Sequence, residues 1–305
     1  AAALGSCLTM ISQREPAERE RWYNHLYNVS MAGFQRATTA SIHGSLLIVE
    51  ELLRHSDEFL ADYFEPICDQ VLRLRDHRVR LIRRTVSFLL PRLAHFDRHV
   101  FVREYLRTAL KHMTRAISQS GERATAFVAL GRLAVAVGSA LAADLKKIFS
   151  MISDALVTRS RKPFCHEALT CVALFAQALG PGLLSQVNLI GIIDQMFADG
   201  LSAALVDALQ EISFHIPQLL PLVQTKLISE LGAILGGVAY NPQVNLLGLV
   251  HYRHHGRLVR LRTTSQEKPG GTETNAVSNP GPNIGKIQEY QRDKLAQTQS
   301  TEKIQ

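Results

Sequence analysis

The stretch RLRDHRVRLIRR, residues 73–84, holds the densest group of side chains able to bind a charged ligand. Guanidinium groups bind carboxylates and phosphates through charge-assisted hydrogen bonds. This basic ridge predicts either a dock for an acidic protein, an anionic lipid or RNA, or a solvated face whose arginines pair with acids on neighbouring elements. The second alternative is favoured, and nucleic acid is the least favoured ligand because the ridge lacks aromatic side chains for base stacking. The ridge consists of Arg73, Arg75, Arg78, Arg80, Arg83 and Arg84.

The sequence contains no set of residues with catalytic spacing. No glycine-rich phosphate loop follows a strand, and neither the kinase motifs nor a G-x-S-x-G nucleophile motif is present. The acid pairs Glu50-Glu51 and Asp57-Glu58 fall on polar helix faces and helix starts, where carboxylates have a structural role. We therefore predict no catalytic residue, no cofactor and no enzyme activity for this chain.

Cysteines and histidines do not form a metal-binding pattern. His166 follows Cys165, but no second pair of ligands lies at metal spacing. The histidines at 251, 254 and 255 cluster in a basic segment that is interpreted more simply as solvated. We expect no metal site, and thiols that are reduced and mostly buried. The four cysteines are Cys7, Cys68, Cys165 and Cys171.

Helices must position these residues, because apolar side chains recur at steps of three and four. One such stripe is Val79, Ile82, Val86, Leu89 and Leu93. Three later stretches repeat the spacing, which is typical of amphipathic helices, and no strand alternation precedes residue 240. The predicted helices are 1–12, 17–37, 42–55, 57–75, 78–95, 98–117, 121–138, 141–158, 164–179, 183–198, 202–215 and 217–235.

Helix pairs recur about every 40 residues. Successive units begin near Arg78, Glu122, Phe164 and Ser202. This period is the signature of a HEAT or armadillo repeat. The predicted fold is therefore all-α: a HEAT/armadillo-type α-solenoid of five to six antiparallel helix pairs over residues 1–238.

A helix breaker recurs at the same period. LLPRLAHF begins at residue 89 and ALGRLAVA at residue 129, so that Pro91 and Gly131 each precede Arg-Leu-Ala. We interpret them as equivalent positions in the second helices of successive pairs. The prediction is a bend at each position, which would let the helices curve with the stack.

Residues 239–305 differ in composition from the rest of the chain. They lack a core pattern and are rich in glycine, proline, serine, threonine, asparagine and glutamine, which predicts a disordered tail. Residues 241–305 carry 9 of the 34 basic and 5 of the 27 acidic residues, and so contribute much of the formal net charge of +7. The best candidate for a membrane span, residues 231–240, is about half the ~20 residues required. No transmembrane segment is expected.

Several blocks of the sequence resemble the N-terminal HEAT-repeat region of the TOR kinases, members of the phosphatidylinositol-3-kinase-related family. The blocks occur in order from residue 1 to about residue 230, and the resemblance stops near residue 240. They are SQREP (12–16), WY (22–23), IHGSLLIVEELLR (42–54), LLPRLAHF (89–96), ERATAFVALGRLAVAV (122–137), TCVALFAQALGPGL (170–183) and GLSAALVDALQEISFHIPQL (200–219).

The resemblance implies a protein-binding scaffold segment of a serine/threonine kinase whose kinase domain lies outside this chain. It also implies Raptor-type companion subunits, a dimeric complex in the parent protein, a role in growth signalling, and a cytoplasmic location with peripheral attachment to endomembranes. No catalytic residue of the family matches a position here. The alternative is a stand-alone HEAT adaptor that binds acidic partners, anionic lipid or RNA through the basic ridge.

Overall fold

The computed structural model describes residues 2–157, 165–236, 249–254 and 257–262. The chain divides into two compact units, residues 1–263 and 264–305. The second unit lies outside the described residues. The predicted boundary at residue 238 also lies outside them and stays a prediction.

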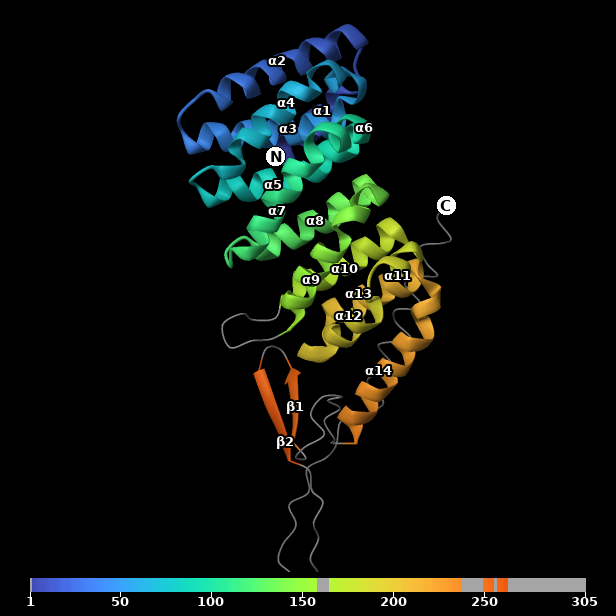
Figure 1. Ribbon diagram of the computed structural model, residues 1–305. Helices are drawn as coiled ribbons and strands as arrows, with labels where there is room; N and C mark the ends of the chain where they lie inside the picture. Colours follow the sequence, from blue (N-terminus) through green and yellow to red (C-terminus); the bar gives the residue numbers. More distant parts are fainter. Residues whose placement is uncertain (1, 158–164, 237–248, 255–256, 263–305) are drawn as a thin grey trace, which may run out of the picture. The chain divides into compact units, whose positions relative to one another are not determined.

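Six helices of the first unit pack side by side in chain order, each against the next, and we call them the contact row (Figure 1). The row consists of α1 (Ala2–Ile11), α3 (Thr39–His55), α5 (Arg80–Phe96), α8 (Arg123–Val137), α10 (His166–Leu179) and α13 (Ala203–His215). The six helices that alternate with them along the chain are α2 (Pro16–Phe34), α4 (Phe64–Arg73), α7 (Leu106–Ser118), α9 (Leu145–Leu156), α12 (Leu189–Met196) and α14 (Leu220–Leu235).

Short helical segments join these twelve helices. They are α6 (Arg98–Val100), α11 (Gly182–Gln186), the π-helical η3 (Phe101–Tyr105) and the 3-10 segments η1 (Asp57–Tyr63), η2 (Leu74–Asp76), η4 (Gly138–Asp144), η5 (Phe197–Asp199) and η6 (Pro217–Leu219). Three of the connections use a glycine with positive φ, at Gly138, Gly180 and Gly200. Glycine adopts this conformation without steric cost, so it ends helices at these points.

The repeat predicted from the sequence is confirmed. The helices α5, α8, α10 and α13 begin within two residues of the predicted unit starts. One predicted helix, 183–198, is instead divided into α11 and α12. The division occurs because Val187 is extended and the Asn188 side chain accepts a hydrogen bond from Gly191 N at 3.1 Å, which caps a new helix.

A two-stranded antiparallel sheet lies within the segment predicted to be disordered. Strand β1 (Leu249–His254) pairs with β2 (Arg257–Arg262) in a register that places His254 opposite Arg257. Most of residues 239–305 lies outside the described residues, so the predicted disorder of this segment stays a prediction. In the sequence, two residues, one of them Gly256, separate two runs that contain β-branched, aromatic and leucine residues. This pattern is typical of a β-hairpin, but no hairpin was predicted.

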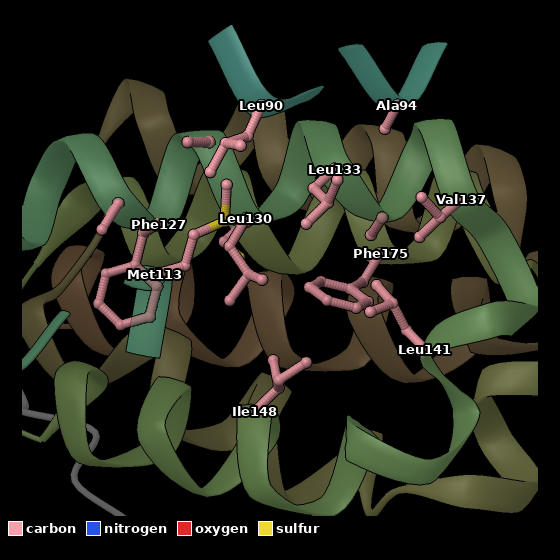
Figure 2. Close-up of a cluster of buried hydrophobic side chains, with 14 of the residues drawn as sticks. Leu90, Ala94, Met113, Phe127, Leu130, Leu133, Val137, Leu141, Ile148 and Phe175 are labelled. Atoms are coloured by element: carbon pink, nitrogen blue, oxygen red, sulfur yellow. The ribbon is translucent and has the colours of Figure 1, made fainter. Parts of the chain in front are cut away.

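The core of the solenoid is continuous from one pair to the next. Figure 2 shows Leu90 and Ala94 of α5 against Leu130, Leu133 and Val137 of α8, and all five side chains are almost fully buried. Ile148 of α9 and Phe175 of α10 pack on the other side of α8. Burial of such side chains stabilises each by roughly 1.5–3 kcal/mol, so α8 is held by neighbours on both sides.

The assignment of the two helix breakers to second helices of their pairs is wrong, whereas the bend expected at each of them stays a prediction. Pro91 and Gly131 lie in α5 and α8, neighbours in the contact row and the first helices of their pairs, and each helix continues through its breaker. A Cβ on Gly131 would lie 2.7 Å from Leu174 Cδ1 and 3.2 Å from Cys171 Cα, both on α10. Glycine at this position therefore lets α8 and α10 approach closely, whereas Pro91 is a buried residue of α5.

One apolar stretch, Arg123–Leu156, passes a length and hydropathy test for a membrane span that the sequence analysis did not identify. The fold divides it among α8, η4 and α9. Phe127 and Leu130 of α8 and Ile148 of α9 are buried in the core. Helices that are apolar on most faces occur inside protein cores as well as in membranes, and half of the apolar window here is buried within the fold.

Candidate functional site

A groove of about 1180 Å³ crosses α3, η1, α5, α8 and α10 on the described surface. It follows the contact row, and four of the six helices of the row contribute side chains to it. Its lining combines apolar side chains, among them Phe88 and Leu174, with the charged side chains of Arg54, Arg92 and Arg132. A wide groove that crosses several helices in this way suits binding of a chain segment.

The repeated Arg-Leu-Ala motif explains how the groove is built. Leu93 and Ala94 of the first copy are buried, while Arg92 is exposed and lines the groove. Arg92 Nε lies 3.5 Å from Glu50 Oε1 on α3, and Glu50 also accepts a hydrogen bond from Arg54 Nη2 at 2.7 Å. The second copy repeats the arrangement on α8.

The arginine of the second copy contacts an aromatic ring instead of a carboxylate. Arg132 Cζ lies 5.8 Å from the centroid of the Phe88 ring on α5. This is a cation–π contact, worth roughly 0.5–1 kcal/mol at an exposed site. Each repeated arginine therefore reaches back to the preceding helix of the row: Arg92 to α3 and Arg132 to α5.

The basic ridge is divided between two environments. Its C-terminal half faces the start of α8: Arg83 Nε donates to Glu122 Oε1 at 2.9 Å, and Arg83 Nη2 also contacts this oxygen. Arg84 Nε donates to Thr125 Oγ1 at 2.9 Å, and Arg80 packs against the backbone of Gly121. These three arginines join one repeat to the next.

The N-terminal half of the ridge has different neighbours. Arg73 at the end of α4 and Arg78 before α5 are exposed. Arg75 lies beside Asp76, with Nε 3.4 Å from Oδ2, and Asp76 also pairs with Arg115 of α7. The fold therefore does not present six arginines as one continuous free surface.

A buried polar pair, Ser87 and His112, was not predicted from the sequence. Ser87 Oγ donates to the Arg83 carbonyl at 3.1 Å and lies 2.9 Å from His112 Nε2. Since the serine proton is used, Nε2 must be the protonated nitrogen and the donor, which leaves Nδ1 as an acceptor. No described residue hydrogen-bonds His112 Nδ1, which is buried.

A small polar cavity of about 340 Å³ adjoins this pair. Arg83, His112, Arg115 and Glu122 are among its lining residues. Burial, and then the Arg115 guanidinium, lower the pKa of His112, so the imidazole is neutral at physiological pH. No signal in the sequence separates His112 from the other eleven histidines, because its partner Ser87 is 25 residues away on another helix.

The three buried thiols are poor nucleophiles, because their pKa values are raised. All four cysteines are free, three are buried and Cys7 is exposed. Burial and the neighbouring Glu167 carboxylate raise the pKa of Cys165 to about 11, and burial also raises the pKa of Cys68 and Cys171. Within the described ranges, no group of three or more metal-ligating side chains converges.

The chain has counterparts in known proteins at the level of sequence. No family model matches the chain. The chain is 40% identical over 241 residues to serine/threonine-protein kinase TOR of Oryza sativa subsp. japonica and 39% identical over 240 residues to that of Arabidopsis thaliana. It is also 32% identical over 248 residues to serine/threonine-protein kinase tor1 of Schizosaccharomyces pombe. These matches cover 78–80% of the chain but only 10% of each relative.

Solved structures resemble the fold at much lower sequence identity. Kap121p bound to Ste12p matches 87% of this chain and 29% of its own length, with a TM-score of 0.56 and 13% identity. Importin beta matches 79% of this chain and 30% of its own length, with a TM-score of 0.51 and 14% identity. These likenesses establish the helical-repeat fold. The long collinear sequence matches add that the chain is homologous to one segment, about one tenth of the length, of the TOR serine/threonine-protein kinases.

Proposed function

We propose that the chain is a non-catalytic, protein-binding scaffold segment of a TOR serine/threonine-protein kinase that supports assembly of the TOR complex in nutrient and growth signalling. The observation that carries the proposal is homology to TOR kinases over 241 of the 305 residues, in a fold built from helix pairs. Under this proposal, the segment belongs to the N-terminal part of the parent protein. The kinase reaction belongs to parts outside it.

The absence of catalysis in the segment itself has a direct test. Phosphoryl transfer requires a phosphate cradle, a lysine on the nucleotide, carboxylates that hold magnesium and a base near the acceptor hydroxyl. No such convergence occurs among the described helices. Calorimetry with Mg-ATP and the purified chain should give no saturable heat. Saturable binding at micromolar affinity would contradict the non-catalytic assignment.

The partners proposed for the segment are Raptor-type subunits, within a complex that is dimeric in the parent protein. The location proposed is the cytoplasm, with peripheral association with endomembranes. A pull-down with the immobilised chain should recover a purified Raptor-type subunit, while a matched importin-beta fragment of the same fold should not. Failure of both this chain and a longer TOR solenoid to recover the subunit would overturn the scaffold proposal.

An alternative proposal is that the chain is a stand-alone adaptor. It would bind acidic partners, anionic lipid or RNA through the basic ridge. It concerns the exposed Arg73 and Arg78, because Arg80, Arg83 and Arg84 contact the start of α8. The double variant Arg73→Glu/Arg78→Glu should weaken salt-sensitive binding to such a partner at low ionic strength. Unchanged binding of acidic protein, anionic vesicles and RNA would remove this alternative.

A further inference from the structure

We propose that the groove binds an extended peptide of about eight residues that places an acidic side chain on Arg132 and apolar side chains beside it. This inference rests on the proposed protein-binding function and names the chemistry of the partner. The distribution of charged side chains along the groove differs between the α3 side and the α8 side.

The α3 side of the groove already contains paired charges. Glu50 is shared by Arg54 and Arg92, at 2.7 and 3.5 Å. Asp97 at the end of α5 accepts a hydrogen bond from Val100 N at 3.0 Å and thereby caps α6. These two carboxylates have partners within the fold. Glu58 of η1 also lines this side, is exposed and forms no ion pair among the described residues, so this side disfavours an acidic side chain of a peptide.

The α8 side of the groove has a charged side chain without an acidic partner in the described part of the chain. Of the described residues from α8 and α10 that line the groove, Arg132 alone is charged. Its guanidinium lies over the Phe88 ring, and among the described residues no carboxylate forms an ion pair with it. An acidic side chain could therefore form a charge-assisted, bidentate contact with Arg132 while the guanidinium stays over the ring.

Apolar side chains surround this arginine. Val135, which is 41% exposed, lies one turn further along α8, and Leu174 contributes from α10. With Phe88 they form an apolar shelf that the fold leaves in contact with water. A peptide with apolar residues next to its acidic residue would bury this shelf, at roughly 25 cal/mol per Å² of apolar surface.

The dimensions of the row set the length of the peptide. The groove crosses from α3 through α5 and α8 to α10, which is three steps between packed helices. Packed helix axes are about 8–10 Å apart, so the span is about 27 Å. An extended chain rises about 3.3 Å per residue, so about eight residues reach from one side to the other.

The test uses the full chain and two fluorescein-labelled nonapeptides, one with a repeating Glu-Phe-Ser sequence and one with a repeating Lys-Phe-Ser sequence. Fluorescence anisotropy should show saturable binding of the acidic peptide that weakens as salt rises. Binding of the basic peptide should be at least ten-fold weaker. Equal binding of both peptides, or no binding of the acidic one, would overturn the proposal.

Two variants and a control locate the contact. Arg132→Glu and Val135→Asp should each weaken acidic-peptide binding about ten-fold or more, because one reverses the charge and the other interrupts the shelf. Arg107→Glu changes an exposed arginine of α7 outside the groove and should bind like the unaltered chain. Circular dichroism verifies that each variant keeps its helix content.

Two further outcomes separate this proposal from others. Unchanged affinity in both groove variants would place the peptide elsewhere and contradict the assignment. Binding of phosphatidylserine vesicles, but not of the peptide, through Arg132 would identify a membrane surface instead and would also overturn it. Neither outcome affects recovery of a Raptor-type subunit in the pull-down, so failure here is distinguishable from failure of the scaffold proposal.

Discussion

At the scale of single residues, this repeat uses side chains to join one helix pair to the next. Arg83 reaches Glu122 over 39 residues of sequence and Arg84 reaches Thr125 over 41. Breaking a buried ion pair is costly because the remaining charge is left without compensation. Much of the basic ridge therefore stabilises the stack, which is the interpretation favoured by the sequence, while its partner-binding role stays a proposal.

Replacement of Gly131 tests the close approach of α8 and α10. In an open helix position, glycine to alanine stabilises by roughly 0.5–1 kcal/mol. Gly131→Ala should instead destabilise by about 1 kcal/mol, because its Cβ would press on Leu174 and the Cys171 backbone. Gly44→Ala in α3 is the matched control, since nothing lies within 4 Å of its Cβ. Urea unfolding measures both, and equal stabilisation by the two changes would contradict the packing argument.

The buried His112 gives the stability of the protein a pH dependence of known sign. Its pKa is lowered in the folded state, first by burial and then by Arg115, relative to about 6.5 in an unfolded chain. As the pH falls below about 6.5, the unfolded chain therefore binds a proton that the native imidazole does not. The free energy of unfolding should decrease with falling pH until the lower native pKa is passed.

The variant His112→Gln isolates this contribution, since glutamine can still donate to Ser87. The charges that face His112 are those of Asp76, Glu122, Arg115 and Arg75, and all remain in the variant. Urea unfolding at pH 7.5, 6.5 and 5.5 should show a shallower loss of stability than in the unaltered chain. His99→Gln, which removes an exposed histidine of α6, is the control. Identical slopes for His112→Gln and the unaltered chain would refute the assignment.

At the scale of helices, side-chain caps decide where several elements begin. Thr38, Asn188 and Ser202 each accept a hydrogen bond from the backbone N–H three residues later. Such caps satisfy donors that the first turn of a helix leaves unpaired. A cap also explains why the structure has two helices where the sequence predicted one over 183–198. The Asn188 side chain caps the N-terminus of α12.

The cap of α13 is directly testable. Ser202 Oγ accepts from Leu205 N at 3.2 Å. Ser202→Ala should lower the free energy of unfolding by about 1 kcal/mol, because the donor loses its partner. Ser202→Asp keeps an acceptor and adds a negative charge at a helix N-terminus, so its stability should equal or exceed that of the unaltered chain. Thermal unfolding of the unaltered chain and the two variants measures these differences. If Ser202→Asp lost as much stability as Ser202→Ala, the result would contradict the proposed cap.

At the scale of the whole molecule, the solenoid is held by contacts between neighbours. Helix α8 packs against α5, α7 and α10, whereas α14 has α13 and η6 as its main neighbours. The exposed apolar side chains of α14 include Ile228 at 70% and Leu235 at 87%. Stability in such an array is roughly a sum of repeat and interface contributions, so it should vary along the stack.

Hydrogen exchange measured by mass spectrometry should reveal this gradient. The backbone amides of α8 and α10 should exchange most slowly, and those of α1 and α14 fastest, because the latter have fewer neighbours to hold their hydrogen bonds. Addition of the acidic nonapeptide should slow exchange selectively in α5 and α8, where its contacts are proposed. Uniform protection from α1 to α14 would show that the array unfolds as one unit.

The sequence by itself determined the helices, their period and the resemblance to TOR kinases. The stripe from Val79 to Leu93 predicts α5 because helix formation depends on neighbours three and four residues apart. The hairpin of β1 and β2 was predictable in the same local way from its two-residue connection but was missed. Homology over most of the chain then identified the family.

Only the tertiary structure decided the role of individual residues. Three contacts join residues that are about 40 positions apart in the sequence. They are Arg92 with Glu50, Arg132 with Phe88, and Gly131 with Leu174. These contacts depend on which faces of successive helices pack together and at what distance, and the local pattern does not contain that information. For the same reason, the sequence located basic residues at 73–84 but not the groove, whose lining comes from four separate helices and a 3-10 turn.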